Sequence, residues 1–322
     1  GNNMVVTENN SKRKFLLWIS ITTNIGLLAF FKYYNFFLES FVNAFTFFGM
    51  EIQANTLDII LPIGISFYTF QTLSFTLDIY YKRLKPTKDF IAFSAFVCFF
   101  PQLVAGPIER ASNFLPQFLK HRNFNYVLAA DGMRQILWGF FKKVVIADNC
   151  GEFANLIFNN SSEMNGSTLL LGLFFFSFQI YGDFSGYSDI AIGTSRLFGF
   201  NIKQNFASPY FSKNIVEFWR RWHISLTSWL TDYIFTPLAL SLRNYERKGI
   251  LFSITITFLL SGLWHGAGWN FVLFGLLHGI YIVIYNFWSK TEISKKNLIT
   301  NTMAKIITFL AVTLSFVLFR AE

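Results

Sequence analysis

The sequence has 322 residues, of which 53% are hydrophobic and 20% aromatic, while only 14% are charged. Because soluble domains usually carry about 25% charged residues, this composition excludes an ordinary soluble domain and predicts a polytopic membrane protein. The formal net charge of +9 is typical of basic cytoplasmic loops that face anionic lipid. We therefore expect contacts with membrane lipid and no nucleic-acid partner.

Apolar segments follow one another along the chain without a soluble insertion. They are too long and too continuous for the hairpins of a transmembrane barrel, whose strands alternate over about 10 residues. We therefore predict an all-α, multi-helix membrane fold with one transmembrane domain over residues 1–322. The abrupt ends of the sequence lead us to expect a fragment that is truncated at both ends.

The first predicted span covers residues 15–31 and the second covers residues 59–77. The segment between them, expected to be a loop, carries the acidic residues Glu39, Glu51 and Asp58. Basic clusters precede the first span at residues 12–14 and follow the second at residues 82–88. The positive-inside rule places both clusters in the cytoplasm.

Residues 90–105 are uncharged but too few for an ordinary span. Pro101, Gly106 and Pro107 interrupt any helix there. The segment is either re-entrant at membrane depth or a buried helix followed by a loop, and the pattern favours neither. Cys98 within it is predicted to be a small core hydrophobe.

Residues 134–148 form an amphipathic segment, predicted to lie in the membrane interface. The apolar run 168–181 leads into a glycine-rich sequence with Asp183 and Asp189. These aspartates are either paired carboxylates for acid–base chemistry or structural groups. We favour structure, with Ser and Asp as helix caps and glycines that permit close packing. Residues 306–319 are the last predicted span.

Residues 214–235 have the pattern of a helix with one apolar face. That face carries Trp219, His223, Leu226 and Leu230. His223 therefore points into packed apolar surface, and a lone histidine in that position is usually structural. Arg221 is one turn from Glu217 and should pair with it. Arg220 and Arg221 would bind a phosphate or carboxylate, or equally anchor the helix to lipid headgroups.

Residues 250–288 contain no Asp, Glu, Lys or Arg, yet they include His265 and His278. This length holds one span, or two short or broken ones, and an ionisable residue inside a span marks a functional site by default. His265 is framed by Gly262, Gly266, Gly268, Trp264 and Trp269. The glycines permit close approach of another backbone or a substrate, and the tryptophans offer walls for a pocket.

From the residues alone, His265 is equally a general base, a proton relay in a transporter or a hydrogen-bonded structural histidine. His278 lies about 220° around a continuous helix from His265 and is predicted to be a packing residue. His121 is predicted to be a solvated loop residue. The pair Cys98 and Cys150 has no metal-ligand spacing or disulfide pattern, and we predict no metal site.

Six stretches of the sequence resemble the membrane-bound O-acyltransferase superfamily, in particular its bacterial branch that acetylates polysaccharides such as alginate and peptidoglycan. The stretches are LPIGISFYTFQ (61–71), FPQLVAGPIER (100–110), GDFSGYSDIAIG (182–193), PYFSKNIVEFWRRWHISLTSWLTDYIF (209–235), LWHGAGWNFVLFGLLHG (263–279) and VLFRAE (317–322). They occur in the order of the family and cover nearly the whole chain.

The resemblance implies a multi-helix fold with re-entrant or short broken helices around a tunnel. It implies transfer of an acyl group, most simply acetyl, from a cytoplasmic thioester to hydroxyls of an extracytoplasmic polysaccharide. It identifies His265 with the family's histidine in Trp-His-Gly, and His223 with a second position that supports the transfer. Candidates for donor binding are Arg220, Arg221 and Trp264.

The same resemblance implies acetyl-CoA or another acyl thioester as co-substrate, no tightly bound cofactor, a partner subunit and residence in the cytoplasmic membrane. Residues 239–249 depart from the Gly-Gly-Asn turn of alginate acetylases, which argues against alginate as the acceptor. The competing hypothesis is a transport or export subunit that uses its histidines as a proton relay while a partner performs the acyl chemistry.

Overall fold

A computed structural model describes residues 4, 9–50, 52, 54–289 and 300–320 of the chain. These residues form helices joined by turns and loops, with no strand among them, which confirms the all-α prediction. They group into two compact units, one of Gly1–Val104 with Ile108–His121 and the other of Ala105–Pro107 with Arg122–Glu322. The single domain over 1–322 stays a prediction.

The first unit contains five α-helices within its described residues: α2 (Asn10–Leu28), α3 (Tyr34–Phe47), α4 (Ile65–Tyr80), α5 (Phe90–Val97) and α6 (Ala111–Phe118). A π-helical segment, Ala29–Tyr33, joins α2 to α3 into one continuous helix. Glu39 therefore lies inside a helix, and its prediction as a loop residue is wrong. The polar bonds Ser20 Oγ to Thr76 Oγ1 (3.0 Å) and Thr72 Oγ1 to Asn24 Oδ1 (2.6 Å) tie α2 to α4.

The helix α4 begins later than the span predicted over residues 59–77. Gly64 precedes it with a left-handed backbone (φ 77°), a conformation that glycine adopts without a steric penalty. A Cβ at Gly64 would lie 2.6 Å from the carbonyl oxygen of Leu103. The left-handed turn and this close contact set the start of the helix at Ile65, which leaves it with 16 residues.

Residues 90–105 form only the eight-residue helix α5 and a 3₁₀ turn, Phe100–Gln102. Both are too short to cross a membrane, so the choice between a re-entrant segment and a packed helix with a loop stays open. Cys98 lies at the end of α5 and is exposed. Its prediction as a core residue is wrong because α5 ends at Val97, before the chain turns.

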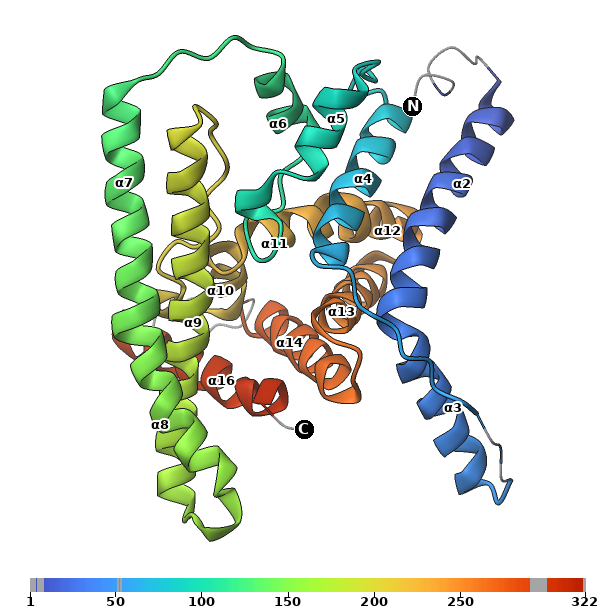
Figure 1. The fold of residues 1–322 in the computed structure, drawn as a ribbon. Coiled ribbons are helices and arrows are strands. Elements are labelled where there is room, and N and C mark those ends of the chain that lie inside the picture. The colour runs from blue at the N-terminus through green and yellow to red at the C-terminus, as the bar shows by residue number, and fades with distance from the viewer. Residues whose placement is uncertain (1–3, 5–8, 51, 53, 290–299, 321–322) are drawn as a thin grey trace. The chain divides into compact units, whose positions relative to one another are not determined.

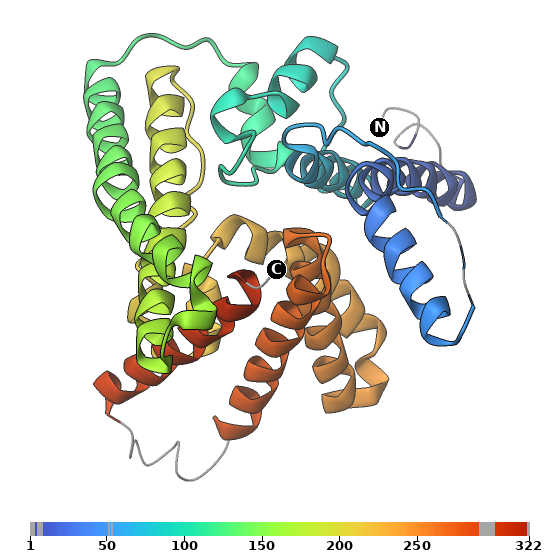
Figure 2. The ribbon, with the colours of Figure 1, turned by 60° about the horizontal axis from the view of Figure 1, so that its bottom comes forward.

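The second unit opens with a long helix made of α7 (Tyr126–Phe140), a π-helical segment (Phe141–Ala147) and α8 (Asp148–Asn159). It is followed by the 32-residue helix α9 (Gly166–Leu197), and α7 lies alongside α9 in both Figure 1 and Figure 2. A Cβ at Gly139 would lie 2.6 Å from the Gly186 carbonyl oxygen, which confirms close packing through glycine. This helix packs along α9, and the placement of residues 134–148 in the membrane interface stays a prediction.

The rest of the second unit consists of α10 (Ile215–Arg221), α11 (Ile224–Leu230), α12 (Thr236–Ser241), α13 (Glu246–His265), α14 (Trp269–Trp288) and α16 (Asn301–Arg320). The helices α9, α10, α14 and α16 share an aromatic core formed by Leu173, Phe206, Ile215, Phe218, Trp219, Trp222, Phe274, Val312 and Phe316. Two members lie outside a helix: Phe206 belongs to the segment after α9, and Trp222 directly follows α10.

Five helical stretches among the described residues are long and apolar enough to cross a membrane: Asn10–Phe47, Gly166–Leu197, Arg243–His265, Trp269–Trp288 and Asn301–Arg320. They include the predicted apolar runs 168–181 and 306–319. They also resolve residues 250–288 into two helices separated by a break at 266–268. The cytoplasmic placement of the basic clusters stays a prediction.

Candidate functional site

His223 lies at a break between two helices, so the prediction of one helix through this position is wrong. α10 ends at Arg221, and His223 has a left-handed backbone (φ 45°, ψ 54°) before α11 begins. Such a conformation costs a non-glycine residue about 1–3 kcal/mol and persists only where its surroundings enforce it. Contacts with other parts of the chain must therefore stabilise this break.

The segment after α9 supplies that stabilisation. The backbone N–H of Ile224 donates to the carbonyl of Asn205 (2.9 Å), and the N–H of Ala207 donates to the carbonyl of Arg221 (2.9 Å). The side-chain oxygen of Asn205 also accepts from Ser225, from its N–H at 3.2 Å and from its hydroxyl at 2.8 Å. Bonds on both sides of His223 thus hold the break in place.

The imidazole of His223 is fully buried among aromatic rings. Its centroid lies 4.7 Å from that of Phe184 and 5.6 Å from that of Trp264. Within the described part of the chain, neither ring nitrogen has a hydrogen-bond partner. His223 lies outside the five candidate spans; burial lowers its pKa well below the usual range, and nearby His265 lowers that pKa further. A neutral, unpaired imidazole results.

His265 is the last residue of α13, directly before the break at 266–268. Its ring lies 5.1 Å from Trp264 and 5.3 Å from Phe319, between centroids, and its side chain is half-buried. Trp264 therefore contacts both His265 and His223, and its role as the wall of a pocket stays a prediction. Trp269 is 62% exposed, and its role as a second wall likewise stays a prediction.

The glycines beside His265 allow helix packing. The space next to Gly266 is filled by the ring of Phe271, and a Cβ at Gly262 would overlap the Phe271 carbonyl oxygen and lie 2.9 Å from the backbone of Gly275. These contacts let α13 and α14 approach closely around a tight turn. Of the two occupants predicted for this space, a neighbouring backbone and a substrate, the structure shows the backbone.

His278 is fully buried and hydrogen-bonded on both sides of its ring. Trp219 Nε1 donates to His278 Nδ1 (3.2 Å), and His278 Nε2 lies 2.9 Å from Ser315 Oγ. Its prediction as a packing residue is confirmed. The break between α13 and α14 also brings His278 near His265. The Phe274 ring contacts both, with centroid distances of 4.5 Å to His278 and 6.1 Å to His265. The separation of about 220° held only for a continuous helix, and the break at 266–268 removes that condition.

The arginines next to His223 differ in their surroundings. Arg221 pairs with Glu217 at 2.7 Å, as predicted, and its guanidinium also donates to the Ala207 carbonyl (3.5 Å). Arg220 is exposed. Arg221 is thus engaged within the protein, which leaves Arg220 as the more accessible candidate for an anionic group. The solvated position predicted for His121 is confirmed.

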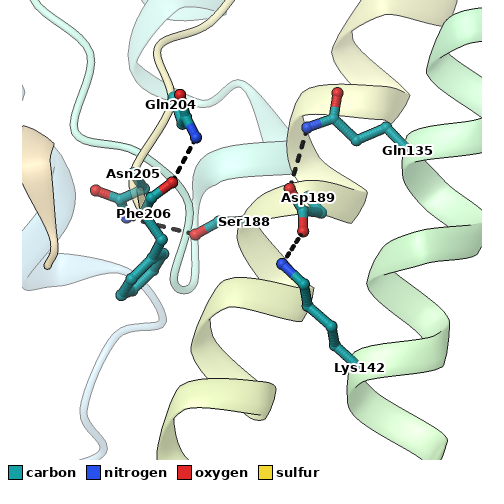
Figure 3. Close-up of polar contacts among 7 residues, drawn as sticks. All are labelled: Gln135, Lys142, Ser188, Asp189, Gln204, Asn205 and Phe206. Atoms are coloured by element: carbon teal, nitrogen blue, oxygen red, sulfur yellow. Dashed lines mark hydrogen bonds and ion pairs between the residues drawn. The ribbon is translucent and has the colours of Figure 1, made fainter. Parts of the chain in front are cut away.

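The two aspartates of α9 form separate ion pairs. Asp189 accepts from Lys142 (2.5 Å) and from Gln135 Nε2 (3.0 Å), as Figure 3 shows, while Asp183 pairs with Lys143 (2.7 Å). Both lie inside α9, so the prediction that they cap a helix is wrong, although their structural role is supported. Asp148 also pairs with Lys143 (2.6 Å), and these carboxylates raise the pKa of Lys143.

Among the described residues, no three or more His, Cys, Asp or Glu side chains are grouped so as to hold a metal ion. His223 and His265, which both contact Trp264, are the candidate site. They stand at two helix breaks, one enforced by a long-range backbone pairing and the other formed by a glycine-rich turn.

The family model of MBOAT, the membrane-bound O-acyltransferase family, matches residues 12–319. The chain belongs to this family. It is 39% identical over 310 residues to the "Probable alginate O-acetylase AlgI" of Pseudomonas aeruginosa, covering 95% of this chain and 57% of that protein. It is 36% identical over 343 residues to the "Peptidoglycan O-acetyltransferase" of Helicobacter pylori, covering 98% and 64%.

This MBOAT chain is also 31% identical over 273 residues to the "Teichoic acid D-alanyltransferase" of Bacillus subtilis, covering 81% of the chain and 69% of that relative. The chain spans about three-fifths of the length of the alginate and peptidoglycan relatives. Family membership together with the candidate spans makes it a multi-pass integral membrane protein.

Proposed function

We propose that this chain is a membrane-bound O-acyltransferase of the cytoplasmic membrane. It would transfer an acyl group, acetyl in our proposal, from a cytoplasmic thioester to hydroxyls of an extracytoplasmic polysaccharide. The observation that carries the proposal is the placement of His223 and His265 against one tryptophan, Trp264. The names of the relatives support it, because three different envelope polymers appear in them as acceptors.

The different exposure of the two histidines supports different roles. His265 is half-buried and would take the proton from the acceptor hydroxyl as general base. The hydroxyl oxygen would then bond to the thioester carbonyl carbon, the carbon–sulfur bond would break, and the proton would pass to the leaving thiolate. His223, fully buried, would orient the donor or polarise its carbonyl, for which a neutral ring with an available N–H suffices.

The donor in this proposal is acetyl-CoA or another acyl thioester, bound as a co-substrate, with no resident cofactor. Arg220 and Trp264 are the candidates for contact with it, and Arg221 supports the helix through Glu217. We also propose a partner subunit of an envelope-modification system, since the relatives act on polymers. The residues 239–249 that depart from the alginate-acetylase turn leave the acceptor undefined.

Replacement of His265 tests the proposal most directly. His265→Ala should lower acyl transfer by about 10²–10⁴-fold, the usual contribution of general acid–base catalysis, while the protein stays in the membrane. His121→Ala is the matched control, because His121 is an exposed histidine in the other unit. Transfer is measured with labelled acetyl-CoA and glycan acceptors; near-normal product from His265→Ala would refute the assignment.

The competing hypothesis of a transport subunit predicts a different result. A proton relay would leave the purified chain unable to consume acetyl-CoA in the presence of a glycan, whatever residue occupies position 265. Consumption by the wild-type chain that disappears in His265→Ala therefore separates the two functions.

A further inference from the structure

A polar pocket of about 260 Å³ lies beside α9 in the second unit. It is lined by Trp138, Lys142, Tyr181, Ser185, Ser188, Asp189, Ile192 and the segment 204–208, and Figure 3 shows its central polar contacts. Several of these side chains belong to α9, a candidate span. Polar and ionisable groups at such a position usually face a substrate path or a water-filled cavity.

The charges in the pocket balance. Lys142 and Asp189 pair at 2.5 Å with side chains 14% and 17% exposed, and they are the one cation and the one anion among the described lining residues. A phosphate or carboxylate ligand needs a cation that is not already neutralised. The pocket therefore suits an uncharged ligand better than the diphosphate of a nucleotide-bearing donor.

The remaining lining offers hydrogen-bond donors and acceptors next to apolar surface. Hydroxyls come from Ser188 and Tyr181, and amides from Gln204 and Asn205, while Trp138 contributes apolar ring surface. A sugar ring carries several hydroxyl groups and also has an apolar face of C–H groups. The polar side chains of the pocket would bind the hydroxyls, and the apolar surface would contact the face. The volume is below the roughly 300–1,000 Å³ of pockets for drug-sized ligands, so it suits one sugar ring.

The pocket is connected to the catalytic candidates through the segment that holds the break at His223. Asn205, which bonds Ser225 beyond the break, also directs its Nδ2 to Ser188 Oγ (3.4 Å). Phe206 lines the pocket and contacts Phe184 (4.9 Å), whose ring contacts His223 (4.7 Å). The pocket is thus separated from His223 by an aromatic layer, and its ligand would not be the reacting group itself.

We propose that this pocket is a subsite for an uncharged sugar residue of the acceptor polysaccharide, distinct from the sugar that receives the acyl group. The inference rests on the proposed function, because it assumes a glycan acceptor. It extends that function by naming a recognition element outside the two histidines. Its consequence is a preference for polymeric acceptors over single sugars.

The test compares two leucine substitutions on the same helix. Ser188→Leu places an apolar side chain in the pocket, and Thr194→Leu, half-buried on α9 but outside the lining, is the matched control. The full chain is assayed with acetyl-CoA and with mono-, di- and tetrasaccharides prepared from peptidoglycan glycan strands, which contain uncharged N-acetylglucosamine. Ser188→Leu should raise KM for the tetrasaccharide at least tenfold, with little change for the monosaccharide.

Gln204→Ala provides a second, milder variant, because Gln204 is exposed and, among the described residues, its amide donates only to the Phe206 carbonyl (2.5 Å). It should raise the tetrasaccharide KM in the same direction by a smaller factor. An unchanged tetrasaccharide KM in both variants would overturn the proposal. A rise in KM for acetyl-CoA instead would overturn it in favour of a site for the thioester arm.

Direct binding separates failure of the subsite from failure of the proposed function. If the wild-type chain transfers no acyl group, the proposed function fails, and fluorescently labelled tetrasaccharides still report on the pocket. Binding to wild type and Thr194→Leu that weakens at least tenfold in Ser188→Leu would support a sugar site. Equal binding by all three proteins, or none by any, would refute it.

Discussion

Two histidines of this protein are fully buried, yet their environments are opposite. His278 has both ring nitrogens hydrogen-bonded, on a regular stretch of α14. His223 has neither nitrogen bonded within the described residues and stands on a left-handed backbone. Burial alone therefore does not identify a functional histidine. An unpaired polar ring on strained backbone is costly, and such cost is typical of functional sites.

The network around His278 assigns its tautomer. Because Trp219 donates to Nδ1, that nitrogen carries no proton, and Ser315 Oγ donates to the Val312 carbonyl at 2.6 Å. Ser315 Oγ is then free to accept the Nε2 proton of His278. The ring is fixed as a neutral imidazole that joins α10, α14 and α16. His223 has no such assignment, which leaves its proton available for chemistry.

Among the substitutions that test this difference between His223 and His278, we expect His223→Asn to have the largest effect. Asparagine tolerates the left-handed backbone better than most residues, so the break should persist while the imidazole is lost. We expect kcat to fall about 10²–10³-fold, the usual cost of removing one polarising group. The assay is acyl transfer in detergent or lipid discs, with the melting temperature measured in parallel.

His121→Asn is the control for this change, since His121 is exposed. A His223→Asn enzyme with kcat within twofold of wild type would make His223 a structural residue like His278.

We expect the opposite result from His278→Leu, which should lower stability and leave kcat nearly unchanged. It leaves the Trp219 N–H without its buried acceptor, at a cost of about 1–3 kcal/mol in the free energy of unfolding. We expect a lower melting temperature and nearly normal kcat per folded molecule, measured by thermal denaturation and by active-site-normalised assays.

His278→Gln retains a side-chain carbonyl and amide, so it should recover part of the lost stability. Loss of kcat by more than a hundredfold in His278→Leu, without a change in melting temperature, would place His278 among the catalytic groups.

The sequence predicted the parts of this site that depend on local pattern. The apolar runs indicated the candidate spans, except that the second predicted span, residues 59–77, is not among them. The spacing of Glu217 and Arg221 indicated their ion pair, which the structure confirms. Burial of His223 also followed from helical periodicity. The family resemblance indicated both histidines as site candidates.

The features that the sequence did not predict depend on contacts between distant segments. The break at His223 is imposed by backbone bonds to Asn205 and Ala207, and no residue near position 223 is a glycine or proline that would signal it. Such long-range contacts do not change the local periodicity of the sequence, so a pattern of neighbouring residues cannot predict them.

The smallest expected effect is the pH dependence that His223 adds to stability. Its folded-state pKa is lowered by burial, whereas an unfolded histidine titrates near 6.5. Below about pH 6.5 the unfolded chain binds a proton that the folded site refuses, so this contribution destabilises the fold as the pH falls. Above that pH, both states are neutral at this position and the contribution is constant.

The slope is at most about 1.4 kcal/mol per pH unit for one histidine. We expect the wild-type melting temperature to fall from pH 7 to pH 5.5 more steeply than that of His223→Asn, whose position 223 does not titrate. Comparison of the two proteins cancels the titration of groups that they share, including His278. Parallel curves for the two proteins would mean that the His223 ring takes up a proton within the fold, and would remove the basis for treating it as a neutral imidazole.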